Sequence, residues 1–476
     1  MARRLLLSFG VCLAGASGAA FAQSAPLGLE DQVAVVERVG ALLTERYVFP
    51  EVAAQCAERL RAQPTKEAPG AVAEPEAFAA WLTQVLRDVS HDEHLLVRVR
   101  AVAASPAPAG PAFPLRERAR RFSRGQESNF GFERVERLEG NVGYLDLRSF
   151  AAPWEAQTTA VSALGFLENT DAVIFDLRRN EGGYPGMVQF LSSYLFAEPT
   201  HLNTLYFREG DRTEEYWTLP DVPGAKLSEV PVFVLTSAQT FSAAEEFSYN
   251  LQAQERATLV GETTRGGANP GGLFPIDAQF EMVIPTGRAI NPVTGTNWEG
   301  TGVVPHVAVP AERALEAALA LARPAAEARR AARAAQWSAL EAAYGDALRL
   351  DDEEQPEAAA RALRAGLEVA ERAGLIHERE VNALGYDLLG QGRVTLAISA
   401  FKLNVATSPA SANAHDSLGE ALKAAGDVPG AIECYERALA LEPAGPNAQA
   451  ARATLAALKA LGDHSPSDPL KRRPGP

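Results

Sequence analysis

Cysteine and histidine are scarce in this chain of 476 residues, and their scarcity limits its chemistry. The sequence has three cysteines and seven histidines, and no group of them shows the spacing of zinc ligands. We therefore expect no metal and no other cofactor. Cys56 and Cys434 fall in segments that are assigned below to different domains, so a disulfide between them is not expected.

Positive charge and long apolar runs are also scarce. The formal net charge is −15 and no basic stripe is present, so we expect no nucleic-acid partner. The apolar run Leu5–Leu13 is too short to span a bilayer comfortably. It follows Arg3 and Arg4 and precedes an A-x-A site that ends at Ala22, an order typical of a secretory signal peptide.

The first residues thus predict export. We expect a signal peptide over residues 1–22, a periplasmic or secreted mature protein, and no membrane span once the signal is removed. A short membrane anchor and lipid attachment at Cys12 are the alternatives.

Composition and hydrophobic periodicity divide the rest of the chain into six segments. They are a helical domain, a Pro/Ala linker, an α/β core, a helical connector, a repeat region and a tail expected to be disordered: 23–102, 103–115, 116–312, 313–345, 346–462 and 463–476.

The core alternates strands with helices. Short apolar runs suited to buried strands cover 141–147, 172–178, 230–237 and 257–262, and helical stretches lie between and after them. Such alternation predicts right-handed crossovers and a mainly parallel sheet.

The repeat region contains two stretches that match at an offset of 34 residues. The matching positions are Leu384/Leu418, Gly385/Gly419, Ala397/Ala431, Phe401/Tyr435 and Pro409/Pro443. The period and residue types resemble the tetratricopeptide repeat, in which small residues permit close helix contact and the aromatic packs between helices. Residues 336–375 are a candidate for a degenerate third repeat, and a generic array of helical hairpins is the alternative. Because such repeats form a concave groove, we expect them to bind a protein partner or substrate.

Ser242 stands between an apolar strand and a helical pattern, with Glu245 three residues later. This spacing predicts a capping box at the start of a helix. The same position suits a nucleophile, because a strand-to-helix corner exposes the hydroxyl and the helix N-terminus stabilises negative charge beside it. A serine nucleophile also needs a base and an oxyanion hole.

Backbone N–H groups are the candidates for that oxyanion hole. Gly182 and Gly183 follow the strand at 172–178, and their lack of a side chain would let an N–H approach a substrate oxygen, as would the N–H of Ala243. An ordinary glycine turn is the alternative. The base must be one of the seven histidines: His91, His94, His201, His306, His377, His415 or His464. The spacing of His91 and His94 is only weak evidence for a metal.

Four motifs, VIFDLRRNEGG, LTSAQTFSAAEE, LVGETTRGGANPGG and WEGTGVVPHVAV, resemble those of the tail-specific, or carboxyl-terminal-processing, serine peptidases. The resemblance covers about residues 30–310 and implies a crotonase-like α/β core with Ser242 as nucleophile. One branch of that family uses a Ser/Lys dyad, but here Gly267 stands at the place of the lysine.

The chain is instead similar to the branch of the tricorn protease core and the interphotoreceptor retinoid-binding protein repeats. This resemblance implies that His94, in a D-x-H motif, is the base and that Glu299 is its acidic partner. Two positions depart from the family pattern. Glu93 is an alternative partner for the base, and His306 replaces the usual aspartate and is a weaker candidate base.

The sequence therefore predicts an exported serine-type peptidase that cleaves peptides or protein tails by a Ser242/His94/Glu299 mechanism. A histidine base predicts that activity falls at acid pH with an apparent pKa of about 6 to 7. The alternatives are a non-catalytic protein that binds apolar ligands or peptides on the same fold, and an adaptor in which the repeats are the active part.

Overall fold

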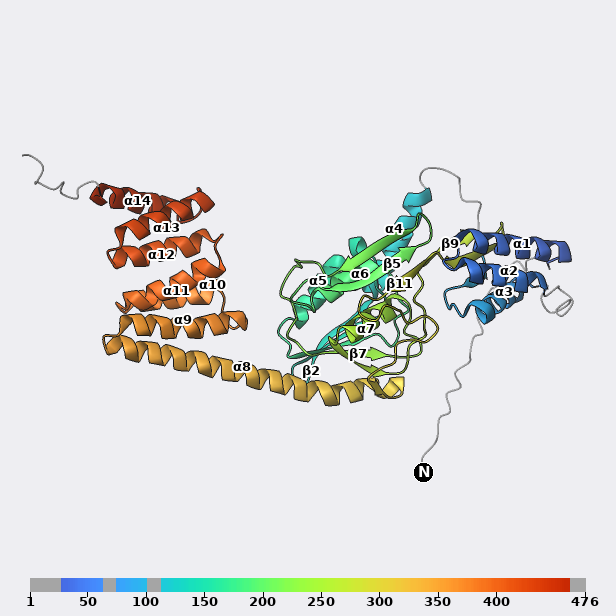
Figure 1. Cartoon of the computed structure of the whole chain (residues 1–476), viewed down its shortest axis with the longest axis horizontal. Coiled ribbons are helices and arrows are strands. Elements are labelled where there is room, and N and C mark those ends of the chain that lie inside the picture. The colour runs from blue at the N-terminus through green and yellow to red at the C-terminus, as the bar shows by residue number, and fades with distance from the viewer. Residues whose placement is uncertain (1–26, 63–73, 101–112, 463–476) are drawn as a thin grey trace, which may run out of the picture. The chain divides into compact units, whose positions relative to one another are not determined.

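A computed structural model describes residues 27–62, 74–100 and 113–462 (Figure 1). The predicted signal peptide, most of the linker and the tail lie outside these ranges. The chain forms two compact units, Met1–Ala326 and Glu327–Pro476, and each is described by itself. Within the described ranges, no helix combines the length and the apolar character needed to cross a membrane.

The first unit is built on a six-stranded sheet with the order β12-β8-β7-β4-β3-β2. All neighbouring strands are parallel except β2 and β3, which pair antiparallel. The strands are β2 (Phe132–Leu138), β3 (Val142–Leu147), β4 (Ala172–Asp176), β7 (Val232–Thr236), β8 (Ala257–Gly261) and β12 (Val307–Ala308). The predicted strands at 141–147, 172–178, 230–237 and 257–262 are thus present, because each is an almost uninterrupted apolar run that is buried on both faces.

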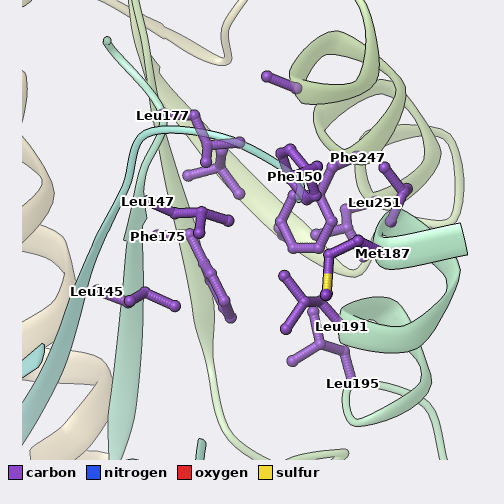
Figure 2. Close-up of a cluster of buried hydrophobic side chains, with 14 of the residues drawn as sticks. Leu145, Leu147, Phe150, Phe175, Leu177, Met187, Leu191, Leu195, Phe247 and Leu251 are labelled. Carbon is purple, nitrogen blue, oxygen red and sulfur yellow. The ribbon is translucent and has the colours of Figure 1, made fainter. Parts of the chain in front are cut away.

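Helices cover both faces of this sheet. One face packs against α5 (Pro153–Leu167), α6 (Pro185–Ser193) and α7 (Ala243–Ala253), and Figure 2 shows the buried leucine and phenylalanine side chains between them. Alternate strand residues point to the other face, where they contact α8 (Ala314–Asp352). That helix begins with buried alanines at every fourth position, Ala314, Ala318, Ala322 and Ala326, which lie on one helix face and let it approach the sheet closely.

The N-terminal helices share a hydrophobic cluster with strands from the core sequence. They are α1 (Leu29–Arg46), α2 (Pro50–Ala62) and α3 (Pro75–Ser90). Their buried side chains pack with Phe280, Met282 and Ile284 of β10 (Phe280–Pro285). β10 pairs with β1 (Leu96–Val99) on one side and β9 (Gly271–Pro275) on the other. This sheet ties the segment that carries His94 to the core.

The first unit also contains a further small sheet, a further helix and two 3-10 helices. β5 (His201–Phe207) pairs with β6 (Arg212–Trp217) and β11 (Gly287–Ile290) in a second three-stranded antiparallel sheet. The helix α4 (Phe113–Glu127) precedes β2, so the predicted linker gives way to a helix at Phe113. Short 3-10 helices lie at Asn129–Gly131 and Ala311–Arg313.

The second unit contains the rest of α8 and helices α9 to α14 (Figure 1). They are α9 (Pro356–Arg372), α10 (Glu378–Gly390), α11 (Val394–Thr407), α12 (Ala412–Ala424), α13 (Val428–Leu441) and α14 (Ala448–Gly462). A methyl group on Gly385 would lie 2.5 Å from the ring of Phe401, and one on Gly419 would lie 3.2 Å from the ring of Tyr435. The small and aromatic residues of the 34-residue offset therefore pack on one another, while membership of the tetratricopeptide family stays a prediction.

The predicted fold class is confirmed in its main features. The chain has an α/β core with a mainly parallel sheet, helices before that core and helices after it.

Candidate active site

Ser242 lies at the corner between β7 and α7, as the sequence predicts. Its backbone has φ 56° and ψ −120°, a conformation that L residues rarely adopt and that often marks a functional site. The backbone N–H of Ser242 donates to Glu245 Oε2 at 2.8 Å, so the carboxylate half of the predicted capping box is present. The corner is thereby held while the hydroxyl faces a cavity.

His94 contacts that hydroxyl although 148 residues separate the two in sequence. The distance from His94 Nε2 to Ser242 Oγ is 3.1 Å, within hydrogen-bond reach. The turn before His94 is fixed by Asp92, whose Oδ1 accepts the His94 backbone N–H at 3.0 Å. Asp92 Oδ2 accepts hydrogen bonds from the Tyr47 hydroxyl and the Asn269 amide, both at 3.0 Å.

Glu299 lies near the imidazole ring. Its Oε2 accepts the backbone N–H groups of Ala268 at 2.5 Å and Asn269 at 3.1 Å. In the part of the chain that the structure describes, Glu299 Oε1 and His94 Nδ1 are both buried without a hydrogen-bond partner. A ring nitrogen of His94 and a carboxylate oxygen of Glu299 lie within 4.8 Å of each other. A small movement or one bridging water would pair these two atoms.

Burial changes the proton affinity of both groups. It raises the pKa of Glu299 to about 8, with the neighbouring Asp92 carboxylate as the second cause. It lowers the pKa of His94 to about 4. The positive charge of Arg265, and to a smaller extent that of Arg87, lowers this pKa further. The imidazole is therefore neutral at pH 7, as a general base must be.

Asp92, His94 and Glu299 also form a group whose ligand atoms lie within 4.8 Å of one another, close enough to be tested as a metal site. The oxygens of Asp92 already accept hydrogen bonds, and Glu299 Oε2 accepts two backbone N–H groups. His94 Nε2 faces Ser242, so His94 Nδ1 and Glu299 Oε1 are the atoms left. These two atoms are the ones in the group that have no hydrogen-bond partner among the described residues.

Two backbone N–H groups are free to hold an oxyanion beside Ser242. The Gly182 N–H donates to Asn180 Oδ1 at 2.8 Å. Among the described residues, the N–H groups of Gly183 and Ala243 donate no hydrogen bond. Gly182 and Gly183 have φ 102° and 146°. A side chain on Gly182 would meet the Ala243 nitrogen at 2.9 Å, and one on Gly183 would collide with the Phe150 carbonyl, so glycine is required at both positions.

The structure separates the other sequence-based candidates from the site. The Glu93 carboxylate forms ion pairs with Arg87 at 3.1 Å and Arg265 at 3.4 Å. His306 Nδ1 accepts the backbone N–H of Leu259 at 2.9 Å, which is a structural role. His91 is exposed and ends α3 in the left-handed region, with φ 54°.

Glu245 was predicted only as part of a capping box, and the structure gives it further contacts. Its Oε1 accepts the Thr264 hydroxyl at 2.5 Å and the Gly266 N–H at 2.6 Å. Its Oε2 accepts the Gly267 N–H at 2.9 Å in addition to that of Ser242. The buried carboxylate thus joins the serine corner to the loop beside His94. The capping-box spacing was its only signal in the sequence.

The cavity in front of Ser242 has a volume of about 310 Å³. Its lining combines a few polar and charged groups with apolar side chains, the usual composition of a ligand site. The lining residues are His94, Gly183, Tyr184, Pro185, Leu205, Ser242, Ala243, Glu246, Gly267, Ala268, Pro270, Gly271, Val283, Ala289 and Trp298.

Comparison with known proteins finds similarity to one peptidase family. Residues 141–309 match the model of peptidase family S41. The α/β core is thus similar to peptidase family S41. The predicted resemblance to the tail-specific serine peptidases is thereby confirmed. Residues 28–117 match the model of the N-terminal domain of family S41 peptidases in eukaryotic IRBP, the interphotoreceptor retinoid-binding protein, which agrees with the predicted branch.

Two relatives of this chain are named carboxyl-terminal-processing proteases. The one from Picosynechococcus sp. is 28% identical over 38% of this chain and 42% of its own length. The one from Synechocystis sp. is 35% identical over 29% of this chain and 30% of its own length. The chain thus spans less than half the length of either relative. A putative peptidase from Parabacteroides merdae of solved structure is 18% identical, with a TM-score of 0.44 over 61% of this chain and 96% of that one.

Gly267, which stands where a Ser/Lys branch is expected to have its lysine, leaves room for the imidazole of His94. A methyl group on Gly267 would lie 2.7 Å from His94 Cε1 and would collide with the ring of Phe241. The His94 and Phe241 rings are 4.5 Å apart, and Arg265 lies 4.5 Å above the Phe241 ring. Any side chain at residue 267 therefore competes with the imidazole for space.

We expect Gly267→Ala to lower kcat/KM for a peptide by about 100-fold, because a displacement of the base by about 1 Å misaligns proton transfer. The matched control is Gly165→Ala on α5, where a methyl group meets nothing within 4 Å. Steady-state kinetics of both variants check the prediction. Wild-type kcat/KM in a folded Gly267→Ala protein would contradict it.

Proposed function

We propose that this protein is an exported serine-type peptidase that cleaves peptides or protein tails, with Ser242 as nucleophile, His94 as base and Glu299 as the group that orients the base. The observation that carries the proposal is the 3.1 Å contact between His94 Nε2 and Ser242 Oγ at a strained strand-to-helix corner. The names of the carboxyl-terminal-processing relatives support the substrate class.

The proposed reaction begins when Ser242 Oγ attacks the scissile carbonyl carbon and His94 Nε2 takes the hydroxyl proton. For Nε2 to accept, the ring must carry its own proton on Nδ1, and Glu299 Oε1 is the acceptor that this tautomer needs. The carbonyl oxygen becomes an oxyanion, stabilised by the N–H groups of Ala243 and Gly183 and by the N-terminus of α7. His94 then returns the proton to the leaving amine, and water releases the acyl group by the same steps.

A fluorophosphonate probe tests the proposal directly. An activated serine attacks the phosphorus and keeps a stable adduct, whereas a serine that only caps a helix does not. We expect mass spectrometry to find the adduct on Ser242 in the wild-type protein and none in Ser242→Ala. An unlabelled, folded wild-type protein would favour the non-catalytic binding protein instead.

The acid limb of the pH profile is expected at a higher pH than a free histidine would give. The active state has a neutral His94 and an ionised Glu299. One further proton goes to Glu299, whose pKa is raised to about 8, rather than to His94, whose pKa is lowered to about 4. We therefore expect kcat/KM to fall as the pH falls through about 8.

Glu299→Gln provides the control for this pH prediction because glutamine cannot take that proton. The acid limb should then move below pH 6, toward the lowered pKa of His94, and the maximal kcat/KM should fall. The measurement is kcat/KM of a short peptide across the pH range for both proteins. A wild-type limb near 6.5 that Glu299→Gln leaves unmoved would show that the two groups do not share the proton.

The proposed roles of the termini are export by the first 22 residues and partner binding by the repeats. An apolar cavity of about 230 Å³ in the second unit supports the second role. It lies between α8, α9 and α10, and its lining includes Trp337, which is 40% exposed, Tyr344 and Leu363. Such a surface suits a peptide with apolar side chains.

Removing the repeats is expected to leave cleavage of a short peptide within about threefold of wild type, because none of the proposed catalytic groups lies in the second unit. A chain that ends after Arg330 keeps the four buried alanines of α8, from Ala314 to Ala326, on the sheet. Circular dichroism first confirms folding, and kinetics on a short peptide and a protein substrate follow. The KM for the protein should rise. Loss of short-peptide cleavage in the folded truncation would make the repeats part of the catalytic unit.

A further inference from the structure

Glu246 lies one helical turn after Ser242 on α7 and lines the same cavity. Both residues line this cavity, so the carboxylate and the hydroxyl border the same space. The Glu246 side chain is only 5% exposed. Its Oε1 accepts a hydrogen bond from Asn203 Nδ2 at 3.1 Å, and among the described residues it has no other hydrogen bond or ion pair.

The adjacent Glu245 is a buried carboxylate in the same helix whose hydrogen bonds can be compared with those of Glu246. Glu245 accepts four hydrogen bonds and is satisfied at both oxygens. Glu246 has one, and burial raises its pKa to about 7 with no cation of the described chain to oppose the shift. A buried carboxylate with a single hydrogen bond and no cation beside it is costly for the folded protein, and such groups are found at functional sites.

Apolar side chains line the cavity together with Glu246. Leu205, Val283, Ala289 and Trp298 line the cavity with apolar surface, and all but Val283 are nine-tenths or more buried. Arginine and lysine have an apolar stem and a charged end, so apolar walls that lead to a carboxylate match both parts of these side chains.

We infer that Glu246 and these walls form the subsite for the residue that supplies the scissile carbonyl, and that the subsite selects arginine or lysine. The inference rests on the proposed function, because the cavity that Glu246 lines is also lined by Ser242 and Gly183, and their proposed roles define which substrate residue enters it. Glu246 acts on specificity by contact with the substrate and takes no part in proton transfer.

The test compares two peptides that differ at one residue, arginine or citrulline, which has almost the same shape but no charge. We expect wild-type kcat/KM to be roughly 10- to 100-fold higher for arginine. Glu246→Gln should abolish this preference, while its amide oxygen still accepts the Asn203 hydrogen bond. Glu198→Gln, which removes the same charge from an exposed position, should keep it.

The preference should also grow from about pH 6 to pH 8, as Glu246 ionises. Both peptides use the same catalytic groups, so effects of pH on Ser242, His94 and Glu299 cancel in the ratio. Equal kcat/KM for the two peptides, or a higher value for a norleucine peptide, would overturn the subsite.

Calorimetry on Ser242→Ala separates this inference from the proposed function, because it measures binding without turnover. The arginine peptide should bind 10- to 100-fold more tightly than the citrulline peptide, and Glu246→Gln in the same background should remove the difference. Discrimination in binding without wild-type turnover or labelling would overturn the peptidase proposal alone. Equal affinities, or no binding of either peptide, would overturn the subsite.

Discussion

Ser242→Ala is expected to lower kcat/KM for a peptide by about 10⁴- to 10⁶-fold, the usual loss when a serine nucleophile is removed. The hydroxyl lies 3.1 Å from the proposed base and faces the cavity, so no other described group is placed to take over the attack. The remaining rate would come from the oxyanion N–H groups and from substrate binding. Steady-state kinetics with active-site titration of the wild-type protein give the ratio.

Stability measurements separate this loss from the effect of a missing helix cap. If Ser242 only capped α7, alanine would cost about 1 kcal/mol of the free energy of unfolding and leave the rate unchanged. Ser248→Ala on the same helix is the matched control. Its buried hydroxyl donates to the Ala244 carbonyl at 2.7 Å and does not line the cavity. We expect that variant to lose stability and keep kcat/KM, the opposite of Ser242→Ala.

His94→Ala is expected to lower kcat/KM by about 10⁴-fold, because Ser242 then has no group to accept its proton. The substitution leaves a space next to Phe241, whose ring is 4.5 Å from that of His94. Added imidazole should enter this space and restore part of the activity. Kinetics with and without imidazole check the prediction, and the restored rate should depend on pH as imidazole titrates.

His91 provides the control for His94. It is exposed and has φ 54°, so His91→Asn keeps a residue that tolerates the left-handed region and avoids unnecessary backbone strain. We expect that variant to retain wild-type kcat/KM. If His91→Asn were inactive and His94→Ala were active, the base would be misassigned.

The sequence alone was enough to predict the sheet and the place of Ser242. The apolar runs at 141–147, 172–178, 230–237 and 257–262 are too continuous for an exposed element, and each ends in polar residues. Because a strand that runs into a helix exposes the first residue of that helix, the position of Ser242 followed from local pattern. The glycine pairs at 182–183 and 266–267 could also be recognised from the local sequence.

Distances between remote residues could not be read from the sequence in the same way. His94 and Glu299 were assigned through resemblance, and their arrangement around the ring depends on the pairing of β1 with β10 and on Asp92. The sequence also predicted an acid limb at about 6 to 7. With the structure, the acid limb is expected at about pH 8 instead. Burial and neighbouring charges set the pKa values of His94 and Glu299, and both depend on how distant segments pack.

By itself the sequence determined what local patterns encode: buried strands, helices, the serine corner, the glycines and the 34-residue offset of the repeats. Only the tertiary structure decided which carboxylates are satisfied and which are free. Glu245 and Glu246 are neighbours with the same side chain, yet one accepts four hydrogen bonds and the other accepts one and faces the cavity. Their difference arises because successive residues on a helix point in different directions, and what each meets depends on segments distant in the chain.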